Sequence, residues 1–221
     1  MTAPIPHGAQ DYLEAIFEME EEGATILQAR IAERMGVTAA TVSQAVGRLA
    51  KEGLIEMEGR KIRLTLKGRE LASPLVRRHR LAERLLTDIL GIPWHRAHEE
   101  AHAWEHVISP EVEQKILEKT GASTCPHGNP IPGVKAPYER SELVPLTDLA
   151  EGEQGTLSLL TEDVELATGV LKYFEDHGLM PGANIGVTVV GPDGTRTLSV
   201  DGKSASLGAT LADNLWVKRA S

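Results

Sequence analysis

The sequence predicts a mainly α-helical chain with an N-terminal winged helix-turn-helix, a helical middle part and a small C-terminal β-barrel. Three observations support this fold class. Near the N-terminus, two short helical patterns joined by a glycine turn precede an alternating hairpin. Longer helical patterns follow, two of which open with proline, and from Leu146 onward short alternating runs are separated by Asp-Gly turns. We therefore divide the chain into domains 1–73, 74–145 and 146–221.

The composition excludes several protein classes. The chain has 221 residues, and its 32 acidic and 23 basic side chains give a net charge of −9, which by itself argues against a nucleic-acid partner. No apolar run reaches the ~18–20 residues that span a bilayer, and the first residues lack the basic-then-apolar pattern of a signal peptide. A single cysteine, Cys125, excludes a disulfide scaffold. We expect a cytoplasmic protein with no membrane partner.

The helix-turn-helix pattern follows a first amphipathic segment at 11–22. Apolar residues recur every four positions over 26–35, as on one face of a helix. Gly36 is expected to end this helix, because glycine adopts the left-handed conformation without penalty. Thr38 is expected to cap a second helix over Ala39–Glu52. Two helices joined by a short glycine turn are typical of DNA-reading folds.

The charge of this region is opposite to that of the whole chain. Residues 30–69 hold nine basic against four acidic side chains, a net charge of +5, so the remainder carries −14. The following segment, LIEMEGRKIRLT, predicts a two-stranded wing with basic residues at its tip. A basic winged helix predicts DNA binding, and the alternative is an ordinary helix pair with a solvated basic face. We expect base contacts from Thr38, Ala40, Thr41, Ser43 and Gln44, and phosphate contacts from Arg30, Arg48, Arg60 and Lys61.

Potential metal ligands recur at helical spacing in the middle of the chain. Thr65–Leu90 predicts a long helix interrupted at Pro74, and Pro93–Ile108 and Pro110–Lys119 predict two more. The segment HRAHEEAHAWEHVI places four potential ligands at i, i+4, i+7 and i+8, on one face of a helix, and the long helix carries a pair at i and i+4. Such groups in register suit a divalent transition metal: His98, His102, Glu105 and His106, together with His79 and Glu83.

Part of this segment also permits an enzymatic interpretation. His102, Glu105 and His106 spell the HxxEH string of inverted zinc peptidases, in which the glutamate is the base. The string lies just after a DNA-binding pattern, and the chain offers no separate catalytic domain. We therefore expect no enzymatic activity, with a metal-dependent hydrolase as the alternative and a metal buffer or chaperone as a third possibility.

The segment Gly121–Pro145 has little periodicity and several prolines, which predicts a linker. Its stretch CPHGNPIPG is too distinctive for a mere spacer, because Cys125 and His127 form a further candidate ligand pair. A packed cysteine is the alternative. Beyond the linker we expect the small β-barrel, with one helix near Val164–His177. Acidic side chains that could complete a site here are Glu83, Asp163 and Glu165.

Several of these segments resemble the diphtheria toxin repressor family of metal-dependent transcriptional regulators. The matching segments are YLEAIFEMEEEG, ARIAERM, TVSQAVGRL, RHRLAERLLTDILG, WEHVIS and GNPIPG. The resemblance covers residues 10–133 and extends more weakly to the end as an SH3-like domain. It implies a homodimer that binds palindromic double-stranded operator DNA when loaded with Fe(II) or Mn(II). It also implies a primary metal site at Asp11, His102, Glu105 and His106, with Glu14 as an extra ligand, and a second site that includes His79, Glu83 and His98.

Two departures from the family pattern concern the metal. Iron-responsive members usually have methionine where Asp11 stands and cysteine where His102 stands, and replacing sulfur by harder donors favours Mn(II). Manganese-responsive members often have glutamate where His102 stands, so the set matches neither branch fully. The ligands that iron-type members take from the SH3-like domain fall at Ala167 and Val170, which cannot bind a metal.

Some manganese-type relatives with an SH3-like domain use a glutamate, a Cys-x-His pair and an aspartate instead. That pattern is resembled here by Glu83, Cys125, His127 and Asp163. His79 and His98 are then shared between sites, form a third site, or simply pack.

We therefore expect a repressor that responds to Mn(II), with Fe(II) as the alternative and Zn(II) or other divalent metals as surrogates. It would control genes for metal-ion transport. The metal would neutralise carboxylates and tie the N-terminal helix to the helical domain, which sets the spacing of two recognition helices in the dimer. Dimer contacts are expected from the apolar sides of the helices between Leu85 and Leu117.

Overall fold

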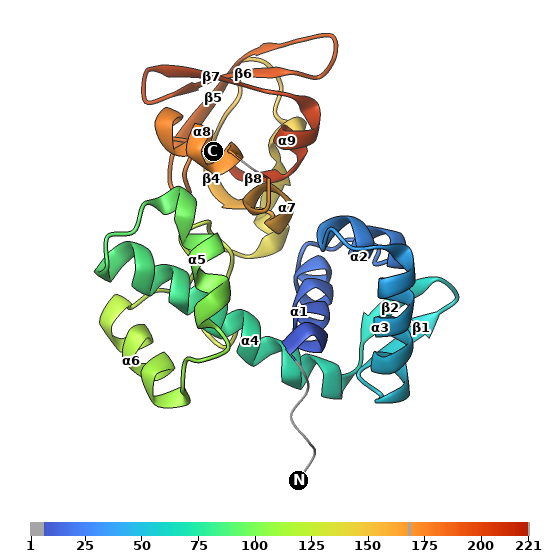
Figure 1. The fold of residues 1–221 in the computed structure, drawn as a ribbon. Coiled ribbons are helices and arrows are strands. Elements are labelled where there is room, and N and C mark those ends of the chain that lie inside the picture. The colour runs from blue at the N-terminus through green and yellow to red at the C-terminus, as the bar shows by residue number, and fades with distance from the viewer. Residues whose placement is uncertain (1–6, 168, 221) are drawn as a thin grey trace. The chain divides into compact units, whose positions relative to one another are not determined.

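The computed structural model describes residues 7–167 and 169–220 (Figure 1). The first six residues of the N-terminal stretch considered for a signal peptide lie outside the described residues. About half of the chain is helical. It divides into two compact units, Met1–His79 with Ala103–Ile108, and Arg80–His102 with Ser109–Ser221. None of the helices in the described ranges has the length and apolar character that a bilayer crossing requires.

The first unit contains the expected winged helix-turn-helix. Its helices and strands are α1 (His7–Glu21), α2 (Gln28–Arg34), α3 (Ala39–Lys51), β1 (Ile55–Glu58), β2 (Lys61–Leu64) and the first part of α4 (Leu66–Arg84). The antiparallel wing pairs Glu58 with Lys61, so Gly59 and Arg60 form its tip. One hydrophobic core joins these elements, with Leu13, Ile16, Ile31, Val46 and Leu49 among its buried residues.

The helix-turn-helix is shaped by the local signals that predicted it. Gly36 adopts the left-handed conformation, with φ of 62°. Thr38 caps α3, and its hydroxyl accepts a hydrogen bond from the Thr41 amide at 3.2 Å. The wing is attached by a backbone bond in which the Ile62 amide donates to the Ile26 carbonyl at 3.0 Å. The wing and the turn before α2 are therefore held together by the main chain.

Helix α4 is not interrupted at Pro74, contrary to the sequence-based prediction. The α-helix runs through this residue to Arg84, and a π-helical last turn, η1 (Leu85–Ile89), carries it on to Gly91. Proline removes the hydrogen bond to the carbonyl of Glu70, but both residues are exposed, so water can solvate that carbonyl.

The helix expected over Pro93–Ile108 is shorter than predicted. A 3₁₀ turn, η2 (Trp94–Arg96), leads into α5 (Ala97–Trp104), and the chain then turns. Pro110 opens α6 (Pro110–Thr120) and keeps Ser109, its N-cap, extended, with ψ of 158°. The single helix face predicted for His98, His102, Glu105 and His106 is therefore wrong, because the last two residues lie beyond the helix end.

The second unit holds a six-stranded antiparallel sheet in the order β3-β8-β4-β5-β6-β7. Its strands are β3 (Leu143–Pro145), β4 (Gln154–Leu160), β5 (Asn184–Val190), β6 (Arg196–Val200), β7 (Lys203–Leu207) and β8 (Leu215–Arg219). The expected barrel is not closed, because β3 pairs only with β8 and β7 only with β6 among the described strands. An open sheet therefore replaces the predicted barrel.

Short helices accompany this sheet: η3 (Arg140–Glu142), η4 (Leu146–Asp148), α7 (Glu162–Glu165), α8 (Val170–His177) and α9 (Ala209–Asp213). The one helix expected near Val164–His177 is two helices, because Gly169 adopts a left-handed conformation, with φ of 76°, just before α8. The core of the sheet includes Leu157, Phe174, Ile185, Leu198 and Val217.

Gly68 tests the packing of α4 in the first unit. A Cβ atom there would lie 1.9 Å from the Leu54 carbonyl oxygen, so we expect Gly68→Ala to destabilise the protein by at least ~1–3 kcal/mol. At Gly47, on the exposed side of α3, a Cβ would meet nothing within 4 Å, and Gly47→Ala should stabilise by ~0.5–1 kcal/mol. Urea unfolding of the metal-free variants measures both, and equal midpoints would contradict this packing.

Candidate metal centres and nucleic-acid interface

The candidate DNA-contacting side chains all lie on the surface of the first unit. The side of α3 that faces the core carries buried residues at helical spacing: Val42, Ala45, Val46 and Leu49. The nine predicted residues are exposed on α2, on the start and outer side of α3, and at the wing. They are Arg30, Thr38, Ala40, Thr41, Ser43, Gln44, Arg48, Arg60 and Lys61. Within this set, the hydroxyl groups of Thr38 and Thr41 share a hydrogen bond of 2.9 Å.

A first cluster of potential ligands lies within the first unit, where α1 meets the turn after α5. One ligand atom from each of Asp11, Glu105 and His106 lies within 4.8 Å of the others. His106 Nε2 is 3.3 Å from Glu105 Oε1 and 3.7 Å from Asp11 Oδ1. We call these three residues the first centre.

Glu105 is held from its other side by His79. The Nδ1 atom of His79 lies 2.5 Å from Glu105 Oε2, and both side chains are buried. His79, which the family resemblance placed in the second site, therefore contacts the first centre. This contact fixes one carboxylate oxygen of Glu105 and leaves Oε1 on the side of His106.

The first centre fits a divalent cation in its donor chemistry. Two carboxylates approach a single imidazole, and the buried Asp11 Oδ1 accepts no hydrogen bond from the described residues. A buried carboxylate oxygen without such a bond is costly unless a cation lies beside it. Glu14 is buried on α1 but outside this three-residue group, and His102 is exposed on α5 in the second unit.

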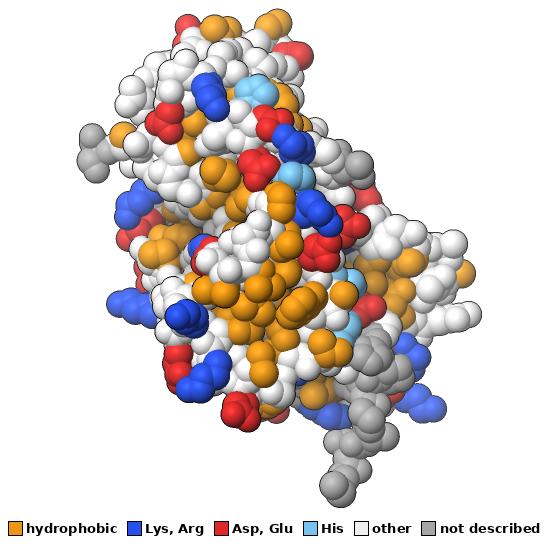
Figure 2. All heavy atoms as spheres, turned by 60° about the vertical axis from the view of Figure 1, so that its left-hand side comes forward, with side chains coloured by type: hydrophobic (Ala, Val, Ile, Leu, Met, Phe, Trp, Pro, Cys, Tyr) orange, Lys and Arg blue, Asp and Glu red, His pale blue; other side chains and the backbone are white. Residues whose placement is uncertain are grey.

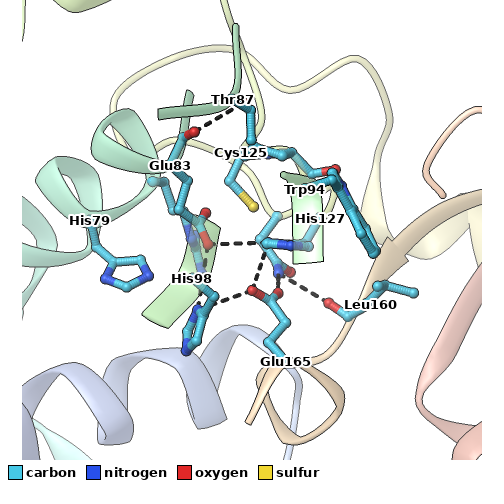
Figure 3. Close-up of polar contacts among 12 residues, drawn as sticks. His79, Glu83, Thr87, Trp94, His98, Cys125, His127, Leu160 and Glu165 are labelled. Atoms are coloured by element: carbon cyan, nitrogen blue, oxygen red, sulfur yellow. Dashed lines mark hydrogen bonds and ion pairs between the residues drawn. The ribbon is translucent and has the colours of Figure 1, made fainter. Parts of the chain in front are cut away.

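A second cluster lies within the second unit and gathers side chains from α4, α5, α7 and the Cys-x-His loop (Figure 3). His127 Nδ1 is 3.1 Å from Glu83 Oε1 and 2.8 Å from Glu165 Oε2. His98 Nδ1 is 3.1 Å from Glu165 Oε2 and 3.4 Å from Glu83 Oε1. Ligand atoms of Glu83, Cys125 and His127 lie within 4.8 Å of one another. We call these five residues the second centre.

The carboxylate that α7 contributes to this centre differs from the one that the family resemblance implied. Asp163 is exposed on α7, whereas Glu165 is buried between the two histidines. Asn129 fixes Glu165 by donating from Nδ2 to Oε1 at 2.8 Å and to the Leu160 carbonyl at 3.0 Å. On a helical turn, Glu162 and Glu165 share a face from which Asp163 points away.

Residues 125–129 of the predicted linker are buried, so this stretch is more than a spacer, as its composition suggested. The His127 carbonyl accepts a hydrogen bond from the Leu160 amide at 3.0 Å, at the end of β4. A Cβ at Gly128, where φ is +96°, would lie 2.1 Å from the Ser158 carbonyl oxygen, so only glycine allows this approach. The loop thereby presents Cys125 and His127 to the second centre.

Buried negative charge exceeds buried positive charge at the second centre. Glu83, Glu162 and Glu165 are all buried, and Glu162 lies 3.7 Å from His98 and 3.6 Å from the buried Arg80. Arg84 also donates to the Cys125 carbonyl, but it is paired with Asp88. Sequence reasoning missed Glu162 and Arg80, although the i, i+3 spacing of Glu162 and Glu165 is a signal that could have indicated a shared face.

The pKa values of the metal-free chain reflect this imbalance. Burial lowers the pKa of His127, but attraction by Glu165 and Glu83 outweighs it and holds that pKa well above its usual range. Burial raises the pKa of the Cys125 thiol to about 12, and the charge on Glu83 adds to this effect. A cation bound by imidazole, carboxylate and thiolate groups would replace the protons on His127 and Cys125. This donor set therefore fits a divalent transition metal.

Three family models match consecutive parts of the chain. Residues 7–62 match the iron dependent repressor N-terminal DNA binding domain, residues 65–133 the iron dependent repressor metal binding and dimerisation domain, and residues 144–219 the FeoA domain.

Individual proteins are similar over most of the chain. The iron-dependent repressor IdeR of Mycobacterium bovis is 41% identical over 202 residues, which cover 86% of this chain and 87% of that protein. The diphtheria toxin repressor of Corynebacterium diphtheriae is 38% identical over 216 residues, covering 94% and 95%. A solved manganese-dependent transcriptional repressor complex with manganese has a TM-score of 0.83 and 31% identity, covering 96% of this chain and 100% of that one.

Glu165 and Asp163 give a matched pair of variants. Glu165→Gln should weaken Co(II) binding at the second centre by at least ~10–100-fold, which is the loss seen when a group that only orients a ligand is removed. Asp163→Asn should leave Co(II) binding unchanged. The thiolate-to-cobalt absorption band measures this, because Cys125 is the only cysteine in the chain. A larger loss in Asp163→Asn would show that the aspartate is the ligand.

Proposed function

The chain belongs to the iron-dependent, or diphtheria toxin, repressor family, and from this premise we propose that it represses transcription in response to Mn(II). The observation that carries the proposal is the approach of Asp11 from α1 to Glu105 and His106 in the unit that exposes the DNA-reading face. Members of this family are metal-dependent DNA-binding repressors, and we assign no catalytic role to Glu105.

The preference for Mn(II) is supported by the donor atoms of the first centre. They are carboxylate oxygens and imidazole nitrogens, and hard oxygen donors suit Mn(II) better than sulfur ligands would. One similar solved structure is a manganese-dependent repressor, whereas the similar IdeR proteins are named for iron. Fe(II) is therefore the alternative metal, and Zn(II) and other divalent ions are surrogates. We propose His102 and Glu14 as additional ligands of the first centre.

We propose the second centre as a further regulatory metal site, in which Glu83, Cys125, His127, His98 and Glu165 supply the donors. Its support is the excess of buried carboxylate over buried guanidinium. A cation there would link α4 and α5 to the loop and to α7 of the FeoA domain. His79 is proposed as the residue that orients Glu105, because its imidazole contacts that carboxylate.

We propose that a homodimer binds palindromic operator DNA through the exposed start of α3, with the wing and α2 on phosphates. The proposed functional parts are residues 1–73 for DNA, 74–145 for metal and dimerisation, and 146–221 as the SH3-like domain. A cation at the first centre would neutralise Asp11 and Glu105 and so fix α1 against the turn after α5. We place the protein in the cytoplasm, with metal-ion transport genes as its targets.

Glu105→Gln tests the metal switch. In this variant we expect the Mn(II) concentration for half-maximal retention of a duplex, selected from random DNA on the Mn-loaded protein, to rise at least ~10-fold. The control is Glu99→Gln, which changes an exposed carboxylate of α5. A thermal midpoint of the metal-free variant near the parent's separates loss of metal from loss of fold. Retention without any metal, or equal half-maximal concentrations, would contradict the switch.

The reading face is tested by two variants of α3. Gln44→Ala should relax the base preference at one position by ~1–3 kcal/mol while leaving Mn(II) affinity intact, because glutamine can bind adenine with two hydrogen bonds. Arg48→Ala should instead weaken binding to all duplexes alike and reduce the salt slope by about one. Selection and salt titration of both variants measure this, and identical behaviour of the two would refute the assignment.

A further inference from the structure

Trp94, at the start of η2, touches the ligand loop of the second centre at two points. Its indole Nε1 donates to the Pro126 carbonyl at 3.0 Å. Its ring lies against the imidazole of His127, with ring centroids 4.6 Å apart and planes tilted by 57°. Figure 3 shows the indole standing beside His127. Pro126 lies between Cys125 and His127 in the sequence. The Trp94 side chain therefore contacts both the main chain between these two residues and the ring of one of them.

Trp94 is fixed in turn by a carboxylate of α8. Glu175 Oε1 accepts from the Trp94 amide at 3.0 Å, and Glu175 Oε2 lies 2.6 Å from His95 Nδ1. Trp94 also packs against the hydrophobic core of the sheet. Both oxygens of Glu175 are therefore used to hold the two residues that open η2, and α8 and η2 are in contact.

None of these contacts involves a donor atom proposed for the metal. Trp94 acts on the loop through its indole, which contacts the Pro126 carbonyl and the His127 ring. Glu175 acts on the loop through Trp94. Groups that orient ligands in this way commonly change metal affinity by ~10–100-fold when they are removed.

We propose that Trp94 and Glu175 are positioning residues of the second centre, which hold Cys125 and His127 in the geometry needed to bind a divalent cation. The inference rests on the proposed metal site at these residues. Through Glu175 it also gives the FeoA domain a second connection to that site, besides the ligand Glu165. The two connections come from different helices, α8 and α7.

Co(II) is the probe, because its absorption separates ligand geometry from mere folding. Trp94→Phe keeps an aromatic ring but removes the indole donor, and Glu175→Gln keeps an acceptor but removes the charge. Both should weaken Co(II) binding in the thiolate band by ~10–100-fold and change the ligand-field bands. The matched controls are Trp216→Phe on β8 and Asp176→Asn, the exposed neighbour of Glu175 on α8.

The outcomes separate this inference from the site itself. If the parent protein shows no thiolate-to-cobalt band, the metal site at Cys125 and His127 fails, and the positioning role fails with it. If the parent shows the band and Trp94→Phe and Glu175→Gln match their controls in affinity and spectrum, only the positioning role is overturned. Glu175 is part-exposed, so Glu175→Gln should disturb folding less than Trp94→Phe. It therefore tests the positioning role even where Trp94→Phe lowers the unfolding midpoint.

Discussion

The second centre depends on three buried carboxylates that lie together, with one buried guanidinium beside them. Glu83, Glu162 and Glu165 are removed from water, and Arg80 is the guanidinium beside Glu162. Taking an ion out of water costs several kcal/mol, so such a group is kept only where another charge lies beside it. The attraction of Glu165 and Glu83, which raises the pKa of His127, favours the charged form of that imidazole. A divalent cation would supply positive charge with better geometry, because it can be bound by several donors at once.

A related arrangement of carboxylates lies in the first unit, which also carries the candidate DNA-contacting residues. Asp11 and Glu105 approach one imidazole, and His79 already occupies the other oxygen of Glu105. Asp11 belongs to α1, whose residues pack in one core with α2, α3 and the wing. A cation that joins Asp11 to Glu105 and His106 would therefore act on the helix-turn-helix through packing rather than through direct contact with DNA. This is how a metal could change DNA affinity without touching a base.

Apolar side chains gather on the face that Figure 2 shows. Exposed apolar side chains include Ile89, Leu90 and Val112 in the second unit and, separately, Trp104 and Val107 in the first unit. Exposed residues of this kind are common at protein interfaces. Residues 65–133 match a metal binding and dimerisation domain, and the homodimer that we propose would be one use for such side chains.

Sequence reasoning succeeded where the signal is local. Gly36 and Thr38 determine the turn through backbone conformation and one capping bond, and neither depends on distant residues. It failed where tertiary contacts decide. The burial of Glu165 and the exposure of Asp163 depend on how one short turn faces Asn129 and the two histidines. Whether the edge strands of a sheet pair to close a barrel is also a long-range property. Alternating runs therefore predicted the strands, but they did not predict that the sheet is open.

The central claim is that cation binding and DNA binding are one coupled equilibrium. Coupling free energies are reciprocal, so DNA must raise the affinity for Mn(II) by the same factor by which Mn(II) raises the affinity for DNA. The most direct test is a calorimetric Mn(II) titration of metal-depleted protein with and without a saturating concentration of the selected duplex. The account predicts tighter Mn(II) binding with DNA present, by ~5–150-fold for typical coupling. Equal Mn(II) affinities in the two titrations would contradict it.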